Sequence, residues 1–244
     1  MIKFIRSLDH KKNRKAKGVF VAEGPKTVGD LMEVFTPTIL VYTTDWLPKG
    51  RKHDATELIS VNEDEMRKVS FLQHPQEVLA VFPIPGTDAI GSYPQKALSL
   101  ALDGVQDPGN LGTIVRIADW FGIKNIYCSE DTADVYNPKV IQATMGSIAR
   151  VNVIYTDLQQ LIDKLPEDYP IYGTLLDGEN IYDEPLTSYG LIIMGNEGNG
   201  ISPEIRAKVN RRLKIDNYPP GQKTADSLNV AIATAITCSE FRRR

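Results

Sequence analysis

Short apolar runs alternate with amphipathic stretches along the whole chain. From Leu98 onward the alternation is regular, and strand-length apolar runs are followed by stretches with apolar residues at helical spacing. Strands are expected at 98–105, 125–130, 150–157, 170–178, 190–198 and 211–217, and helices at 110–121, 138–149, 157–165, 202–209 and 227–242. Such alternation predicts an α/β fold, in which a parallel sheet carries helices on both faces.

The first part of the chain shows a similar alternation on a smaller scale. Strands are expected at 18–24, 38–43 and 77–85, and helices after Pro25 and over 62–72, the second with an acidic first turn. Prolines and glycines then crowd residues 83–95, which can continue neither a helix nor a central strand. We therefore expect a small N-terminal α/β domain over 1–85, a linker over 86–96 and a larger domain over 97–244.

The composition is that of an ordinary globular protein. The chain has 244 residues, of which 42% are hydrophobic and 24% charged, which excludes a disordered or fibrous protein. No window approaches the run of about 18 apolar residues that a membrane span needs, and the basic N-terminus has no apolar region behind it, unlike a secretory signal. The two cysteines lack CxxC spacing and the three histidines do not cluster. We therefore expect a cytoplasmic protein with no disulfide framework and no metal site.

Basic residues gather at the N-terminus, although the net charge of the whole chain is −3. Residues 1–26 carry a local charge of +6, so the remainder of the chain carries −9. Cations clustered on a mildly acidic protein indicate contact with a polyanion through its phosphates; a solvated surface is the alternative. The side chains that we single out for such contact are Arg6, Lys11, Lys12, Arg14, Lys15 and Lys17.

Ligands of open α/β sheets bind at the carboxyl ends of the strands, which directs attention to three loops. The first loop, Asp103–Arg116, contains the turn signal DPGN before an amphipathic helix. Arg116 falls roughly 160° from the middle of the apolar stripe of that helix, so it is expected to project away from the core. The alternative is an exposed helix arginine beside an ordinary turn.

The second loop, Met194–Ser202, follows a buried strand and is rich in glycine. Ser202 is expected to cap a helix that begins at Pro203. The glycine spacing GxxGxG reverses the dinucleotide fingerprint, and no phosphate loop of the GxxxxGK[ST] type occurs. This loop is either a tight structural turn or a ligand-binding loop.

The third loop connects the strand ending near Ile215 to a helix expected to begin at Ser227, with Asn229 in its first turn. A buried Asn is costly unless its amide is hydrogen-bonded. Asn229 therefore either lines a polar site or holds a neighbouring loop.

Together, the three loops resemble the signature of the SpoU (TrmH) family of RNA ribose 2′-O-methyltransferases. The motif DxxxDPxNxGxxxR matches at 103–116, MGNEGNGIS at 194–202 and SLNVAIA at 227–233. The N-terminal segments FVAEGPKTVGDLM (20–32) and QEVLAVF (76–82) look like a substrate-binding domain of the ribosomal-protein-L30e-like type. We refer to these stretches as the motif-one loop (103–116), the motif-two loop (194–202) and the motif-three segment (227–233).

The resemblance implies several properties that periodicity alone does not. The C-terminal segment would thread through an earlier loop as a trefoil knot of the SPOUT type, the cofactor would be S-adenosylmethionine, and the protein would be a homodimer with a shared active site. The substrate would be RNA, more readily ribosomal than transfer RNA because of the extra N-terminal domain, and neither a membrane nor a metal would be involved. A catalytically silent RNA-binding or ribosome-assembly protein, a base methyltransferase of the knotted superfamily and a nicotinamide-dependent dehydrogenase are the alternatives.

The resemblance also assigns residues. The implied catalytic residues are Arg116, Asn110, Glu197, Ser227 and Asn229, and the implied cofactor contacts are Gly195, Ile215, Leu228, Thr174 and Leu175. The loop over 216–226 departs from the family pattern, so no contact is carried over to it.

The implied roles follow from chemistry at a ribose 2′-hydroxyl, whose oxygen gains negative charge as it is methylated. A guanidinium is effectively always protonated, so we interpret Arg116 as a cationic clamp on the target phosphate and 2′-oxygen; a base role would require a neighbouring cation to lower its pKa. Asn110 would orient Arg116 or the ribose, and Glu197 would anchor the motif-two loop or pair with Arg116. Ser227 and Asn229 would complete a polar wall.

Overall fold

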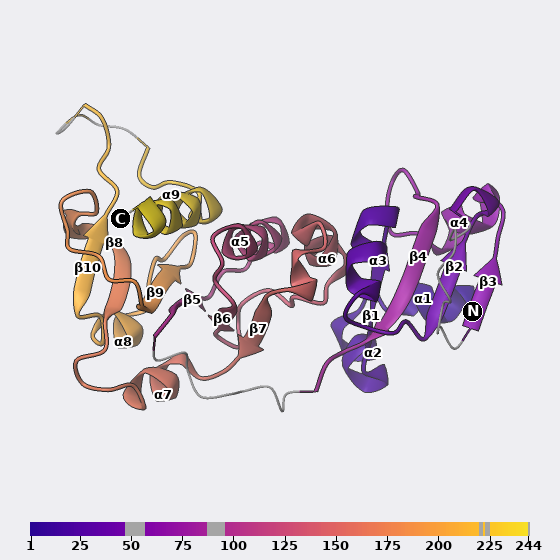
Figure 1. The fold of residues 1–244 in the computed structure, drawn as a ribbon, viewed down its shortest axis with the longest axis horizontal. Helices are drawn as coiled ribbons and strands as arrows, with labels where there is room; N and C mark the ends of the chain where they lie inside the picture. Colours follow the sequence, from indigo (N-terminus) through magenta and orange to yellow (C-terminus); the bar gives the residue numbers. More distant parts are fainter. Residues whose placement is uncertain (47–56, 87–95, 220–221, 223–224, 244) are drawn as a thin grey trace. The chain divides into compact units, whose positions relative to one another are not determined.

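The computed structural model describes residues 1–46, 57–86, 96–219, 222 and 225–243. The chain divides into two compact units, each of which is described by itself (Figure 1). The first unit contains Met1–Gly86 together with Asp134–Ala149, and the second contains Thr87–Ala133 and Arg150–Arg244. The segment Asp134–Ala149, which we expected within the larger domain, therefore packs with the first unit. Most of the expected linker over 86–96 lies outside the described residues.

The first unit is built on a four-stranded sheet with the order β1-β4-β2-β3. Its strands are β1 (Val19–Glu23), β2 (Ile39–Tyr42), β3 (Glu57–Ser60) and β4 (Val78–Pro83). Strand β4 runs antiparallel to β1 and β2, whereas β2 and β3 are parallel. The sequence predicted three of these strands and missed β3, because this edge strand is short and mostly exposed and lacks an apolar run.

Helices pack on this sheet and bury its apolar residues, among them Ile5, Leu8, Val21, Val41 and Leu79. They are α1 (Ile2–Ser7), α2 (Lys11–Lys17), α3 (Pro25–Met32), the 3-10 turn η1 (Thr44–Trp46), α4 (Glu63–Val69), α6 (Pro138–Thr144) and the 3-10 turn η3 (Ser147–Ala149). The expected acidic first turn is present in α4, where Asn62 and Glu65 form a reciprocal capping box. The single helix expected over 138–149 is interrupted by Met145 and Gly146, which both have positive φ.

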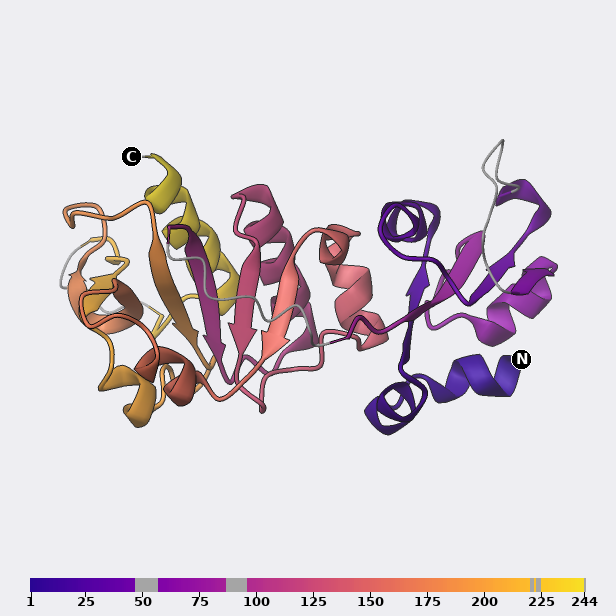
Figure 2. The ribbon, with the colours of Figure 1, turned by 60° about the horizontal axis from the view of Figure 1, so that its bottom comes forward.

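The second unit is a six-stranded parallel sheet with the order β10-β8-β9-β5-β6-β7. Its strands are β5 (Leu98–Asp103), β6 (Asn125–Cys128), β7 (Asn152–Tyr155), β8 (Ile171–Asn180), β9 (Gly190–Gly195) and β10 (Arg211–Lys214). Helices α7 (Leu158–Asp163) and α8 (Pro203–Arg206) cover one face, and α5 (Pro108–Trp120) and α9 (Val230–Arg243) cover the other (Figure 2). The predicted α/β fold, a parallel sheet with helices on both faces, is thus confirmed.

Strand β8 is irregular where its two neighbours stop pairing with it. It pairs with β9 only over Ile171–Gly173, and its register with β10 jumps from Gly173 to Glu179. Residues 174–178 therefore have no register partner in either strand, which leaves their backbone polar groups outside the sheet ladder. Among the helices of the described residues, none is long and apolar enough to cross a membrane.

Candidate active site

The motif-one and motif-two loops leave the sheet at neighbouring points. Strands β5 and β9 are paired along their length, so that Asp103 at the end of one lies opposite Gly195 at the end of the other. The Asp103 carboxylate accepts a hydrogen bond of 2.7 Å from the backbone N–H of Ser202. This bond ties the start of the motif-one loop to the end of the motif-two loop.

The motif-two loop is a tight turn closed by Asn196 and Gly200, whose backbones exchange two hydrogen bonds of 2.9 Å. The Asn196 side chain accepts from the N–H groups of Gly198 and Asn199 and donates to the Gly104 carbonyl at 2.7 Å. A Cβ on Gly195 would lie 2.3 Å from the carbonyl carbon of Gly200, so only glycine fits where the turn crosses the strand end. The loop is therefore a rigid element fastened to the motif-one loop.

A chain of polar side chains joins all three motifs. Asn229 donates through Nδ2 to Oδ1 of Asn110 at 2.9 Å, and Asn110 donates through Nδ2 to Oε1 of Glu197 at 2.9 Å. The other Glu197 oxygen accepts a longer bond of 3.4 Å from the backbone of Gln106. The structure thus brings together three of the five predicted catalytic residues.

Each amide in this chain has one orientation that satisfies its partners. An ionised Glu197 can only accept, so Asn110 must present its NH2 group to the carboxylate and its oxygen to Asn229. The oxygen of Asn229 in turn accepts from the N–H groups of Ala231 and Ile232 in the first turn of α9. The series of hydrogen bonds from Asn229 through Asn110 to Glu197 therefore runs in one direction. It is anchored at the N-terminus of α9 at one end and at the Glu197 carboxylate at the other.

The expected helix start at Ser227 is wrong, because α9 begins at Val230. Asn229 lies just before the helix and caps it, and is exposed instead of buried. Ser227 is also exposed, and within the described residues no hydrogen bond joins it to the Asn110–Glu197 pair.

Arg116 projects to solvent from α5, as the sequence predicts. Within the described part of the chain, its guanidinium has no hydrogen-bond or ion-pair partner. Arg116 lies six residues after Asn110 on the same helix, which places it roughly 9 Å further along the axis and about 120° away around it. The Asn110 amide and the Glu197 carboxylate are bonded to each other and to none of the guanidinium nitrogens of Arg116, so the expected Glu197–Arg116 pairing is not formed within the described residues.

Comparison with known proteins matches both parts of the chain. Residues 97–239 match the model described as the SpoU rRNA Methylase family, and residues 1–80 match the MRM3-like substrate binding domain. The chain belongs to the SpoU rRNA methylase family.

Individual relatives of this SpoU-family chain extend over nearly its whole length. The 23S rRNA (guanosine(2553)-2′-O)-methyltransferase RlmP of Bacillus subtilis is 31% identical over 99% of this chain and 95% of its own length. A solved TrmH-family structure from Porphyromonas gingivalis has 41% identity and a TM-score of 0.88, covering 99% of this chain and 96% of that one. An AdoMet-bound rRNA methyltransferase structure from Sinorhizobium meliloti has 30% identity and a TM-score of 0.86, covering 99% and 94%.

Of the five residues that the SpoU resemblance assigns to the cofactor, two lie at or next to a strand end, two lie within β8 and one precedes α9. Thr174 and Leu175 begin the unpaired segment of β8, Gly195 ends β9 and Ile215 directly follows β10. Leu228 is 51% exposed and lies just before α9. Leu176, which was not predicted, is 73% exposed in the same unpaired segment.

This arrangement fits a cofactor held by backbone groups and apolar contacts. Residues 174–178 have no register partner in β9 or β10, and Leu176 and Leu228 offer apolar surface that is costly to leave in water. In the described part of the chain, no three His, Cys, Asp or Glu side chains gather to hold a metal ion. Burial raises the pKa of both thiols, that of Cys238 to about 12, which argues against a thiolate nucleophile.

Sequence reasoning missed three residues that shape the site. Asp103 and Asn196 stand inside the quoted motifs but were assigned no role, and their spacing gave no sign of the bonds to Ser202 and Gly104. Ser129 lies outside the motifs, after β6; its hydroxyl accepts from the N–H of Gly104 at 2.8 Å and donates to Asp131 at 2.5 Å. No local pattern marks such a residue, because its partner is distant in the chain.

The N-terminal cations divide into two groups. Five of the six predicted RNA contacts are exposed on α1 and α2, namely Arg6, Lys11, Lys12, Lys15 and Lys17. The prediction is wrong for Arg14, whose side chain is only 2% exposed.

Arg14 is committed to partners inside the first unit. Its guanidinium donates to the carbonyls of Leu8 and Asp9 at 2.7 Å each and to the Asp134 carboxylate at 2.5 Å. It therefore closes the α1–α2 turn and holds the segment Asp134–Ala149, and it is unavailable to a phosphate.

Proposed function

We propose that this protein transfers a methyl group from S-adenosylmethionine to a ribose 2′-hydroxyl of ribosomal RNA. The observation that carries the proposal is the Asn229–Asn110–Glu197 chain, which assembles polar residues of all three SpoU motifs at the carboxyl ends of β5 and β9. The Bacillus subtilis relative is named for a 23S rRNA 2′-O-methylation and the Sinorhizobium meliloti relative for rRNA, which favours ribosomal over transfer RNA.

The cofactor, when bound, supplies an electrophilic methyl group. The task of the chain is to place the ribose 2′-oxygen in line with that group and to stabilise the charge that develops on the oxygen. We assign the contacts to the cofactor to Gly195, Ile215, Leu228, Thr174 and Leu175. Their backbone groups and apolar side chains suit a ligand without phosphates, in agreement with the absence of a phosphate loop from the sequence.

Arg116 is proposed as the cationic clamp. Its guanidinium is exposed and unpaired within the described residues, so no internal ion pair has to break before it engages a phosphate and the 2′-oxygen. Asn110 and Asn229 would form the polar wall, with Ser227 beside them, and Glu197 would fix their orientation instead of pairing with Arg116.

The position of Arg116 supports a homodimer. The Cα of Arg116 lies roughly 9 Å along α5 from that of Asn110 and about 120° around the helix axis, so the two side chains leave the helix in different directions. In a homodimer formed through the knotted region, Arg116 would act in the site of the partner subunit. The proposed trefoil knot is supported by α9, which returns from the edge strand β10 to pack against α5.

We assign RNA binding and catalysis to different domains, following the two family matches. Residues 1–85 would bind RNA through Arg6, Lys11, Lys12, Lys15 and Lys17, residues 86–96 would link the domains and residues 97–244 would carry the chemistry, in the cytoplasm. Replacing Lys11, Lys12, Lys15 and Lys17 together with Gln should then weaken RNA binding and its salt dependence more than cofactor binding.

Two measurements test the proposed function. Thermal denaturation should be shifted upward by S-adenosylmethionine or its demethylated product and not by NAD. Mapping 2′-O-methyl groups in cellular RNA with and without the gene should reveal one or more ribosomal sites that depend on it. The proposal would be contradicted if the protein binds the cofactor but deletion of its gene changes no ribose methylation.

A further inference from the structure

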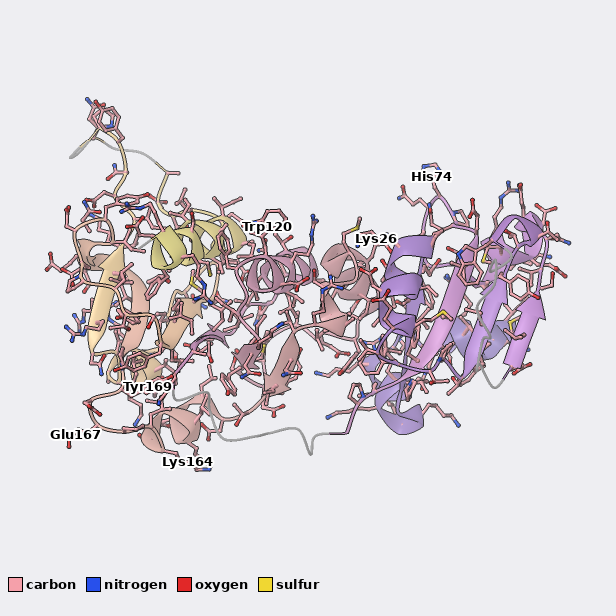
Figure 3. All side chains as sticks on the ribbon, viewed as in Figure 1. Lys26, His74, Trp120, Lys164, Glu167 and Tyr169 are labelled. Carbon is pink, nitrogen blue, oxygen red and sulfur yellow. The ribbon has the colours of Figure 1, made fainter. Side chains whose placement is uncertain are left out.

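The one tryptophan of the second unit is the last residue of α5, the helix that carries Arg116. The side chain of this residue, Trp120, is 85% exposed (Figure 3). It follows Arg116 by four residues, so the two side chains lie on the same face of the helix, one turn apart. The exposed indole therefore presents an aromatic face on the same side of the helix as the guanidinium that the proposed reaction uses.

Several cations lie on, or bond to, the residues that flank Trp120 in the chain. Arg242 donates to the carbonyls of Phe121 and Gly122, the two residues after Trp120, at 2.8 and 3.4 Å. Arg150 is paired with Asp119, the residue before it, and Lys124 follows exposed a few positions later. With Arg116 one turn away, these side chains carry more positive than negative charge. We call the set Arg116, Asp119, Trp120, Lys124, Arg150 and Arg242 the Trp120 surface.

We infer that the Trp120 surface binds single-stranded RNA, with a base stacked on the indole and flanking phosphates on Arg116, Lys124 and Arg242. Aromatic faces stack on any base, and neighbouring cations neutralise the backbone, which is the combination used by single-strand binding proteins. This inference rests on the proposed function, because RNA must reach Arg116 for its next nucleotides to reach Trp120.

The chemistry of the surface favours RNA over a second copy of the chain. A two-fold contact centred on Trp120 would bring the same cations of both copies together, and like charges at an interface oppose association. An RNA strand instead supplies both a π-face for the indole and negative charge for the cations.

The protein contains only two tryptophans, Trp46 and Trp120, so a Trp46→Phe variant reports on Trp120 alone. The probe is a short single-stranded RNA oligonucleotide of mixed sequence, titrated without cofactor. We expect saturable quenching of the fluorescence, and we expect Trp120→Ala to weaken RNA binding about fivefold or more while Trp120→Phe keeps most of the affinity. Tyr182→Ala is the matched control, because Tyr182 is 48% exposed but stands beside Asp183 and Glu184; it should leave RNA affinity unchanged.

Salt dependence separates stacking from charge. Trp120→Ala should leave the dependence of affinity on salt concentration unchanged, whereas Lys124→Gln should reduce its logarithmic slope by about one. Unchanged fluorescence on RNA addition, or RNA affinity retained in Trp120→Ala, would overturn the inference. So would an emission shift that follows protein concentration without RNA, since it would show a second copy covering Trp120.

The readouts also separate this inference from the proposed function. A protein that methylates RNA but shows no quenching by the oligonucleotide refutes the Trp120 surface alone. A protein whose Trp120 is quenched by RNA but which methylates none supports the surface and refutes the proposed reaction.

Discussion

Asn110 donates a 2.9 Å hydrogen bond to Glu197 although 87 positions separate the two residues in the chain. One stands at the start of α5 and the other in the motif-two loop, so the bond fixes the relation between two of the three SpoU motifs. Because Asn229 donates to the opposite side of the same amide, the third motif is fixed by the same side chain. The catalytic proposal is therefore most directly tested at position 110.

Replacing Asn110 with Asp should set two carboxylates against each other at this contact. We expect stability to fall by about 1–3 kcal/mol at neutral pH and methyl transfer to fall with it, since a donor is replaced by a like charge. A second change, Glu197→Gln, returns a donor to the pair and should recover much of the lost stability. Chemical denaturation of the single and double variants measures both effects; a double variant no more stable than Asn110→Asp would show that the pair does not hold the loops together.

Replacing Arg116 with Ala should reduce kcat by about a hundredfold or more, because a charge that stabilises the developing oxyanion is removed. The affinity for S-adenosylmethionine and the melting temperature should hardly change, since Arg116 is exposed and unpaired within the described residues. Single-turnover methyl transfer and calorimetric cofactor binding measure the two quantities. Retained activity in Arg116→Ala would remove the clamp from the mechanism, and activity retained in Arg116→Lys would show that charge alone is enough.

Replacing Arg14 with Met should destabilise the first unit by about 3–5 kcal/mol, because it leaves the Asp134 carboxylate without its buried partner. Lys15→Met is the matched control on the same helix and should shift stability by no more than about 0.5 kcal/mol. For RNA binding we expect the opposite order, with position 15 mattering more than position 14. Lys15→Gln should reduce the slope of log affinity against log salt concentration by about one. Equal destabilisation by the two Met variants, measured by denaturant unfolding, would argue against the buried pair.

Replacing Gly195 with Ala should open the motif-two turn, since the new Cβ would meet backbone atoms of Gly200 and Ile201 at 2.3 and 2.4 Å. We expect a loss of about 1–3 kcal/mol in stability and a weaker cofactor complex. Gly198→Ala is the control, because its Cβ would make an ordinary contact of 3.6 Å with Asn196. Cofactor titration should show weaker binding for Gly195→Ala and unchanged binding for Gly198→Ala. Equal cofactor affinity in the two variants would show that the motif-two turn does not contribute to the cofactor site.

Glu23 should make the first unit sensitive to pH. Burial raises the pKa of this carboxyl from 4.5, and hydrogen bonds from Ser70 and Phe71 together with the charge of Arg6 oppose the rise. A raised folded-state pKa means that the protonated form stabilises the fold: this contribution is complete below pH 4.5 and is lost as the pH rises through the folded-state pKa. Relative to Glu23→Gln, which does not titrate, the wild-type protein should gain stability as the pH falls. The free energies of unfolding of the wild-type protein and of Glu23→Gln are measured with denaturant. A difference between them that does not change with pH would contradict this prediction.

Local patterns predicted the elements whose residues carry their own periodicity. The six strands of the second unit and the helix after DPGN follow from apolar runs and helical spacing, and the exposure of Arg116 follows from its angle to the apolar stripe. Strand β3 escaped prediction because an exposed edge strand has no apolar run. The start of α9 was misplaced because Asn229 caps the helix from outside it, and a capping role depends on backbone angles that composition does not reveal.

By itself, the sequence determined the parallel α/β architecture, the three loops at the strand ends and the family resemblance, since each depends on residues close together in the chain. Only the tertiary structure decided which polar groups meet. It joined Asn110 to Glu197 and Asn229, and it buried Arg14 against Asp134. The physical reason is that a side chain's partners are set by packing between segments far apart in the chain, and the same arginine is a phosphate contact or a buried clamp according to what lies across from it.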